Sequence, residues 1–299
     1  MKAVQKIKYL KIQKKRGVIM KKLLSILIAA VVMLTVVVPA LAKADRLEQI
    51  KEKGYIEFCT EPYWAPNEFI DPNKTGDEQY VGSDIELAKL IADTIGVELK
   101  LNPLDFSAVL AGTASGKCDM AISAIAYNEQ RAMAMRLSKG YYYSEDSEDD
   151  GYGFLVREED VDKYTSIEDL ANATVITQSG SYQEGLYNKY CNNAKNFKLV
   201  ANMTDAYLAV SENKADVCIT AISSGKLYAE ANGGLSTTSF KFDVKEEEEG
   251  TVIACPLDGT ESLMEVINGV IDDILESGQY IEWRNEYVEY AKTLGLDNN

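Results

Sequence analysis

The chain has 299 residues, 46% of them hydrophobic and 26% charged, an ordinary globular composition that excludes a disordered or low-complexity protein and leaves room for two modest domains. Nine of its 31 basic residues and none of its 47 acidic residues lie within residues 1–42, so the body of the chain beyond residue 42 carries about 25 negative charges. This excess makes nucleic acid and anionic membrane surfaces poor partners.

Residues 1–42 have the pattern of a secretory signal. A basic start leads into an apolar stretch over 23–38, and a proline and an A-x-A motif ending at Ala42 follow. We therefore expect an exported, periplasmic or extracellular protein whose mature chain begins near Lys43. Met20, followed by two lysines, is a possible true start. An uncleaved membrane anchor is the alternative, because the stretch from Leu23 to Ala42 is just long enough to span a bilayer.

The first half of the mature region alternates short strands with amphipathic helices, as in an α/β protein. A helix over Ser83–Ile95 is expected to begin with Ser83 and Glu86 as an S-x-x-E capping box. The other elements expected in this half are strands over 55–60, 97–101 and 119–123 and a helix over 106–114.

The same alternation restarts after residue 150, beyond the polar stretch Ser144–Asp150. The expected elements are strands over 174–177, 198–200 and 216–220, helices over 182–190, 204–212 and 224–231, and two C-terminal helices over 261–296 that break at Gly278. Two α/β units of similar size predict two lobes. Because ligands of such folds bind at the carboxyl ends of strands, we expect the site in a cleft between the lobes.

Cysteine usage favours buried packing over a disulfide or a metal site. The cysteines are odd in number, widely spaced and mostly set in apolar runs, and the chain has no histidine. We predict no cofactor and no bound metal. The five residues are Cys59, Cys118, Cys191, Cys218 and Cys255.

Two helix starts carry the features of an anion site. Asn128 follows an apolar strand and can cap a helix whose first turn holds Arg131, so that a guanidinium, free N–H groups and the helix dipole would meet. In the second half, Ser181 and Glu184 form another capping box directly after Gly180, where glycine permits close approach of the backbone. A solvated arginine and a merely well-capped helix are the alternative interpretations.

The chain resembles the family 3 solute-binding proteins of bacterial ABC transporters for polar amino acids, which have the type II periplasmic-binding-protein fold. The likeness runs from Arg46 to Leu296. Its motifs are Val81–Ala88, Ser115–Ser123 leading to Glu129-Gln130-Arg131, Gln178–Gly180, Lys214-Ala215-Asp216 and Gly278-Gln279-Tyr280.

The resemblance implies two lobes, each with a mostly parallel sheet flanked by helices, joined by two hinge crossovers. Residues 45–143 with 251–299 would form lobe 1, and residues 144–250 would form lobe 2. The acidic runs at 145–150 and 246–249 would then lie at the hinge, as solvated loop or as a site for a hard cation such as calcium. The implied partners are a small carboxylate ligand and the permease and ATPase of an importer, with the binding protein a monomer.

The resemblance also assigns the ligand contacts. The residue matching the family's carboxylate anchor is Arg131, helped by backbone donors at Ser123, Ala124, Ala126, Ser181 and Tyr182. Trp64 and Phe106 match aromatic positions that sandwich the ligand side chain. Glu61 matches an acidic position at the polar end of the ligand.

Three departures from the family pattern affect the substrate. Ala221 stands where an aspartate usually pairs with the ligand's α-ammonium, Ala126 replaces a hydroxyl residue, and Asn67 replaces an aromatic. Alanine cannot pair with an ammonium, and a buried unpaired charge is costly. Either Glu61 takes the ammonium, or the ligand is not an ordinary α-amino acid.

The expected function is thus non-catalytic delivery of a carboxylate-bearing solute to an importer. A periplasmic lyase or dehydratase on the same fold, with Glu61 or Glu184 as the acid, is one alternative. A ligand-sensing domain is another. No hydrolase or nucleotide-binding motif is present in the sequence.

Overall fold

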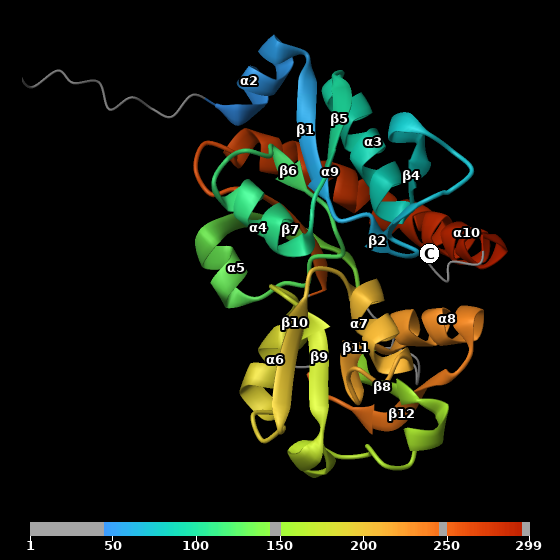
Figure 1. Cartoon of the computed structure of the whole chain (residues 1–299). Helices are drawn as coiled ribbons and strands as arrows, with labels where there is room; N and C mark the ends of the chain where they lie inside the picture. Colours follow the sequence, from blue (N-terminus) through green and yellow to red (C-terminus); the bar gives the residue numbers. More distant parts are fainter. Residues whose placement is uncertain (1–44, 144–150, 245–249, 295–299) are drawn as a thin grey trace, which may run out of the picture. The chain divides into compact units, whose positions relative to one another are not determined.

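The computed structural model describes residues 45–143, 151–244 and 250–294 (Figure 1). The chain divides into two units, residues 1–44 and 45–299, and every described residue belongs to the second. The predicted signal sequence and both acidic runs lie outside the described residues. None of the described helices is long and apolar enough to cross a membrane.

The first large sheet has the strand order β5-β1-β6-β13-β7. Four of its five strands point the same way, because β1 is parallel to β5 and β6 while β13 alone is antiparallel to both of its neighbours. The strands are β1 (Tyr55–Thr60), β5 (Glu98–Pro103), β6 (Met120–Ala121), β7 (Met135–Tyr142) and β13 (Thr251–Pro256). We call this sheet and its helices lobe 1.

Alternating side chains of this sheet build a core on each face. Ile56 and Phe58 of β1 pack on one face with residues of four helices, whereas Cys59 packs on the other with α4. The helices of lobe 1 are α2 (Arg46–Lys53), α3 (Ser83–Ile95), α4 (Phe106–Ala114), α5 (Glu129–Ala134), α9 (Glu261–Ser277) and α10 (Gln279–Thr293). A small sheet of β2 (Tyr63–Trp64), β3 (Glu68–Ile70) and β4 (Tyr80–Val81) and a 3₁₀ turn at Gly76–Gln79 complete it.

The second large sheet repeats this plan with the order β10-β9-β11-β8-β12, in which only β8 runs against the rest. We call this sheet and its helices lobe 2. Its strands are β8 (Tyr152–Arg157), β9 (Thr174–Gln178), β10 (Asn196–Val200), β11 (Val217–Ala221) and β12 (Leu235–Lys241). Its helices are α6 (Tyr182–Tyr190), α7 (Met203–Ser211) and α8 (Ile222–Asn232), with 3₁₀ turns at Glu158–Asp160 and Glu168–Asn172.

The predicted α/β fold with mostly parallel sheets is confirmed. Chain connections between the sheets run through 144–150 and 245–249, outside the described residues, so the predicted hinge boundaries stay predictions.

The capping box predicted at Ser83 is wrong. Gly82 is the N-cap of α3, and the Ser83 hydroxyl lies 3.2 Å from the Tyr280 hydroxyl instead of capping its own helix. Glycine is required there, because φ is 132° and an added Cβ would lie 2.1 Å from the carbonyl oxygen of Asn67.

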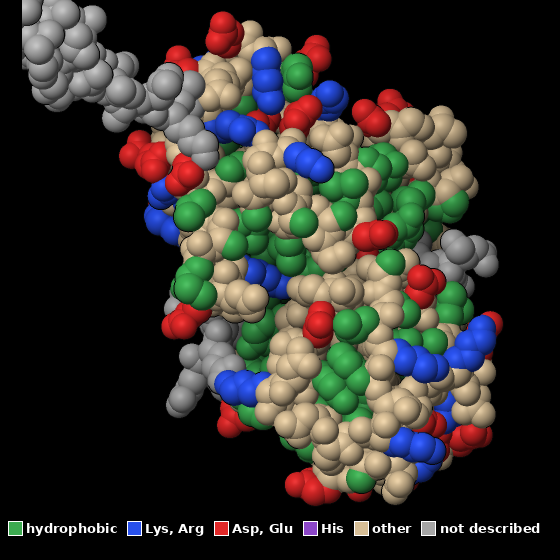
Figure 2. Space-filling view, turned by 60° about the vertical axis from the view of Figure 1, so that its left-hand side comes forward, with side chains coloured by type: hydrophobic (Ala, Val, Ile, Leu, Met, Phe, Trp, Pro, Cys, Tyr) green, Lys and Arg blue, Asp and Glu red, His purple; other side chains and the backbone are tan. Residues whose placement is uncertain are grey.

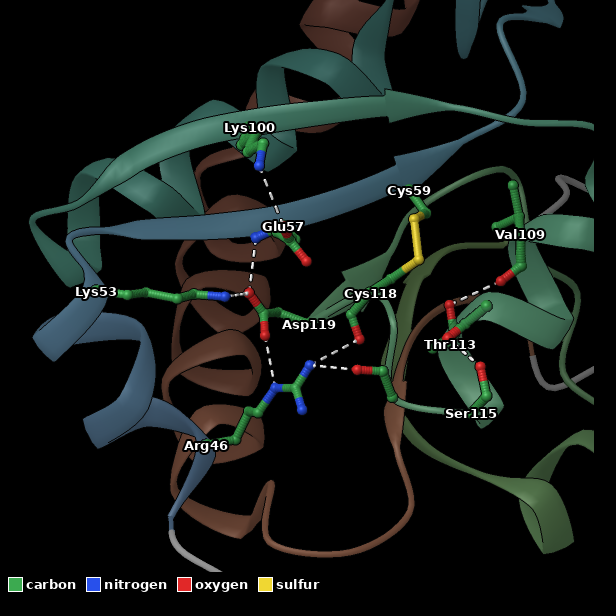
Figure 3. Close-up of a disulfide and its surroundings, with 12 residues drawn as sticks. Arg46, Lys53, Glu57, Cys59, Lys100, Val109, Thr113, Ser115, Cys118 and Asp119 are labelled. Atoms are coloured by element: carbon green, nitrogen blue, oxygen red, sulfur yellow. Dashed lines mark hydrogen bonds and ion pairs between the residues drawn. A yellow bond between two sulfur atoms is a disulfide. The ribbon is translucent and has the colours of Figure 1, made fainter.

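The prediction that all five cysteines are unpaired is also wrong, because Cys59 and Cys118 form a disulfide (Figure 3). The two are 59 residues apart in sequence, and neighbouring strand pairing brings them together, since Cys59 of β1 is opposite Ala121 of β6. Next to the bridge, the buried Asp119 carboxylate accepts hydrogen bonds from Arg46 and Lys53 (Figure 3). The remaining cysteines, Cys191, Cys218 and Cys255, are free and buried.

Candidate functional site

A cleft of about 100 Å³ lies where strands of both large sheets end. Glu61 follows β1, and Gln178 and Ala221 are the last residues of β9 and β11. The cleft brings together all ten predicted site residues: Glu61, Trp64, Phe106, Ser123, Ala124, Ala126, Arg131, Ser181, Tyr182 and Ala221. The lining residues that were not predicted as contacts are Asn67, Tyr142, Gly151, Tyr152, Gln178, Gln183, Ser223, Ser224, Thr251 and Arg284.

Arg131 is buried between the lobes and is 6% exposed. Asn128 caps α5 as predicted, accepting the Arg131 backbone N–H at 2.8 Å. The guanidinium donates to the Ala126 carbonyl in lobe 1 and, at 2.9 Å, to the Gly180 carbonyl in lobe 2. It also lies 5.5 Å from the centre of the Phe106 ring.

The charge of Arg131 has no anionic partner among the described residues, because its hydrogen bonds go only to backbone carbonyls. Burial lowers the pKa of Arg131 to about 10, because the charged guanidinium is held away from water. Such a group binds a carboxylate with two parallel hydrogen bonds and recovers the lost solvation.

The turn of lobe 2 that faces Arg131 is rigidly held. Ser181 caps α6 by accepting the Glu184 N–H at 3.1 Å, which confirms the predicted cap. The Glu184 carboxylate reaches back to the Gly180 N–H at 2.6 Å. Because the Ser181 hydroxyl also donates to the Gln178 carbonyl, the turn presents the Gly180 carbonyl at a fixed position.

Glu61 is a second buried ionisable group in the cleft, 2% exposed. Its Oε1 accepts a hydrogen bond of 2.7 Å from the side-chain amide of Gln178, which crosses from lobe 2. Burial raises the pKa of Glu61 to about 8, and the nearby charge of Asp105 contributes, while Gln178 opposes the rise. The carboxyl is therefore mostly uncharged at pH 7.

Replacing Glu61 with glutamine should stabilise the ligand-free protein at alkaline pH. The folded-state pKa of about 8 lies above the ordinary glutamate pKa of 4.5, so ionisation favours the unfolded chain increasingly between those two pH values. Glutamine cannot ionise and keeps an acceptor for Gln178. The free energy of unfolding of Glu61→Gln should match wild type at pH 4 and exceed it by a few kcal/mol at pH 8.

Denaturant titrations from pH 4 to 9 measure this difference, with the exposed Glu129→Gln as the matched control. Parallel curves for Glu61→Gln and wild type across the whole range would show that Glu61 is not held neutral by burial.

Ser123 and Ala124 are already engaged by a buried acidic network beneath the cleft. The Ser123 hydroxyl accepts the Glu61 N–H at 3.0 Å and donates to Glu68 at 3.1 Å. The Ala124 N–H donates to Asp84 at 2.9 Å, which holds Ala124 at a φ of 45°. Burial raises the pKa of Glu68 well above its usual value. Ser123 and Ala124, predicted as ligand contacts, thus also stabilise the backbone beneath the cleft.

Aromatic side chains enter the cleft from both lobes. Phe106 begins α4, and Trp64 of β2 packs partly against the core of lobe 2. Lobe 2 adds Tyr152 and Tyr182, whose ring centres are 4.9 Å apart and which form an aromatic wall. Tyr152 is the first residue of β8, a strand that the sequence did not predict, so no local signal marked it.

A larger hollow of about 690 Å³ lies on the other side of Arg131, between α4, α5 and α6. Figure 2 brings forward the side on which these helices lie in Figure 1, and hydrophobic side chains are exposed there between scattered charges. The 100 Å³ cleft is the better candidate, because Glu61, Ala221 and the aromatic residues line it and not the larger hollow.

Comparison with known proteins identifies the family to which the chain belongs. The pattern of the bacterial extracellular solute-binding proteins, family 3, matches residues 56–290. The chain is 26% identical over 262 residues to the arginine-binding extracellular protein ArtP of Bacillus subtilis, and the match covers 87% of this chain and 95% of the relative.

A solved structure gives the same result. The amino acid ABC transporter substrate-binding protein AbpA of Streptococcus pneumoniae, bound to L-arginine, is 30% identical with a TM-score of 0.73, covering 81% of this chain and 98% of that one. A shorter match, 27% identical over 90 residues, is to the cyclohexadienyl dehydratase of Pseudomonas aeruginosa, and it covers 30% of this chain and 32% of the enzyme.

Proposed function

Since the chain belongs to the bacterial extracellular solute-binding proteins of family 3, with the type II periplasmic-binding-protein fold, we propose that it captures a carboxylate-bearing amino acid or derivative in the cleft and delivers it to an ABC importer. Arg131 is the carboxylate anchor. The protein acts outside the cytoplasm after export, and its partners are the permease and ATPase of the importer.

One observation carries the proposal. Arg131 is 6% exposed, and its guanidinium bonds to carbonyls from both lobes and has no acidic partner among the described residues. A ligand carboxylate supplies the missing charge and contacts both sides of the cleft at once. Contact with both lobes is what makes ligand binding favour the closed arrangement that a transporter can recognise.

The rest of the cleft suits an amphipathic solute. Phe106 and Trp64 from one side and Tyr182 from the other cover the apolar part of the ligand. Glu61 contacts its polar end, as a hydrogen-bond donor when neutral and as a charge partner when ionised.

A thermal-shift screen with amino acids, N-acyl amino acids and dicarboxylates tests the function. A ligand at 100 times its Kd stabilises the folded protein by about 2.7 kcal/mol, which raises the Tm of a protein of this size by roughly 5 to 10 °C. We expect at least one carboxylate compound to give such a shift. If no compound in the panel shifts the Tm, carboxylate capture is contradicted.

We further propose that binding is not followed by catalysis, because the relatives matched over most of the chain are binding proteins and the dehydratase match covers only 30% of it. Incubating the protein with its ligand and analysing the mixture by mass spectrometry should return the ligand unchanged. Time-dependent conversion that Glu61→Gln abolishes would instead indicate an enzyme.

A further inference from the structure

We propose that the ligand carries a second acidic group and that Arg284 binds it, an inference that rests on the carboxylate capture proposed above. Arg284 belongs to α10, the last helix of lobe 1, far in sequence from every other residue assigned to the site. It nevertheless lines the same cleft as Arg131.

The side chain of Arg284 is held in place but is not neutralised. Its guanidinium lies 4.7 Å from the centre of the Tyr142 ring, which fixes its orientation through a cation–π contact. Its Nε atom is buried and has no hydrogen-bond partner among the described residues. A buried donor without an acceptor is costly, and an anionic ligand group supplies that acceptor.

The charge balance of the cleft points to the same ligand. Its lining holds two arginines, Arg131 and Arg284, against one carboxyl, Glu61, which burial keeps mostly neutral at pH 7. The cleft is therefore a positive site within a chain of net charge −16. A ligand with one carboxylate neutralises only one arginine, whereas a diacid neutralises both.

The start of α8, next to Arg284, favours an anion over an ammonium. Ala221 is the N-cap of α8 and provides no side-chain acceptor, so the positive end of this 11-residue helix is left open toward the cleft. Ser223 and Ser224 of its first turn line the cleft together with Arg284. An ammonium at this end of the cleft would meet a cation and a helix N-terminus, and the side chain of Ala221 has no acceptor for it.

Arg284, Ser223 and Ser224 also line a second hollow, between α8 and α10. Its other charged residues are Lys226, Lys292 and Glu230. Arg284 thus stands at the boundary of the cleft, on the side where residues of α8 and α10 line one hollow, and Lys292 there is paired with Glu289.

Two matched pairs of ligands test the inference by isothermal titration calorimetry. L-glutamate and L-glutamine, like L-aspartate and L-asparagine, differ only in the second acidic group. We expect the acid of at least one pair to bind about 10-fold or more tightly than its amide. Glutarate, which has no ammonium, should bind at least as tightly as L-glutamate, since Ala221 cannot pair with an ammonium.

Variants of the second subsite give the sharper result. Arg284→Gln should remove the preference for the acid, so that the acid and its amide bind with similar Kd values, and Arg284→Lys should keep part of that preference. Ala221→Asp should reverse the order, favouring the amino acid with its ammonium over glutarate. The inference would be overturned if both amides bind as tightly as their matched acids or more tightly. A preference for the acid that survives Arg284→Gln would overturn it as well.

Failure of this inference is distinguishable from failure of the proposed function. If the acids bind no more tightly than their amides, with affinities that depend on Arg131 but not on Arg284, carboxylate capture stands and the second subsite does not. If none of these compounds binds, or binding is unaffected by Arg131→Ala, both fail.

Discussion

Replacing Arg131 with alanine should reduce ligand affinity by about 30- to 5,000-fold, the effect of 2 to 5 kcal/mol expected when one partner of a buried, hydrogen-bonded charge pair is removed. The loss should appear mainly in the dissociation rate. The fold should survive, because the hydrogen bonds of the Arg131 guanidinium to other described residues go only to the backbone carbonyls of Ala126 and Gly180. Calorimetry with the strongest ligand of the thermal-shift screen measures the change.

Arg136→Ala is the matched control. Arg136 lies on β7, donates to the Leu257 carbonyl and pairs with Glu261, and it does not line the cleft. The Arg136→Ala variant should keep the wild-type Kd within about twofold, since surface substitutions far from a site usually have small effects. Arg131→Lys should bind more weakly than wild type, because an ammonium cannot form the two parallel bonds of a guanidinium. Unchanged affinity in Arg131→Ala would remove Arg131 from the site.

Removing the disulfide should have the largest effect on stability. Closing a loop of the 59-residue separation between Cys59 and Cys118 restricts the unfolded chain and stabilises the folded one by about 4 kcal/mol. The double variant Cys59→Ser, Cys118→Ser should therefore unfold at a clearly lower denaturant concentration than wild type. The loss of stability should also affect the cleft, because Cys59 packs with Phe106 and lies two residues before Glu61.

The control for the disulfide is chemical reduction. A reducing agent should lower the unfolding midpoint of wild type and leave that of the double variant unchanged. Thiol titration of the unfolded, unreduced wild-type protein should find three thiols, those of Cys191, Cys218 and Cys255. Five reactive thiols would contradict the bridge.

Local sequence signals predicted the elements that depend on local physics. Helices α4 and α6 begin and end at the expected residues, and the caps at Asn128 and Ser181 form as expected. These features follow from apolar periodicity and from side chains that bond within three residues. The capping box at Ser83 failed because a distant residue, Tyr280, bonds to the same hydroxyl.

Features that depend on distant pairing were missed. The bridge from Cys59 to Cys118 and the bond from Gln178 to Glu61 span 59 and 117 residues. Neither spacing nor composition indicates which remote residues meet, because sheet pairing and the approach of the lobes decide it. Arg284 was missed for the same reason, since nothing near it in the C-terminal helix marks it as a site residue.

The position of the ligand carboxylate in a crystal structure of the complex tests the central claim most directly. We predict both carboxylate oxygens within hydrogen-bond distance of the Arg131 guanidinium, between the lobes. A ligand bound elsewhere, or one whose carboxylate points to solvent while Arg131 keeps its bonds to Ala126 and Gly180, would contradict the account.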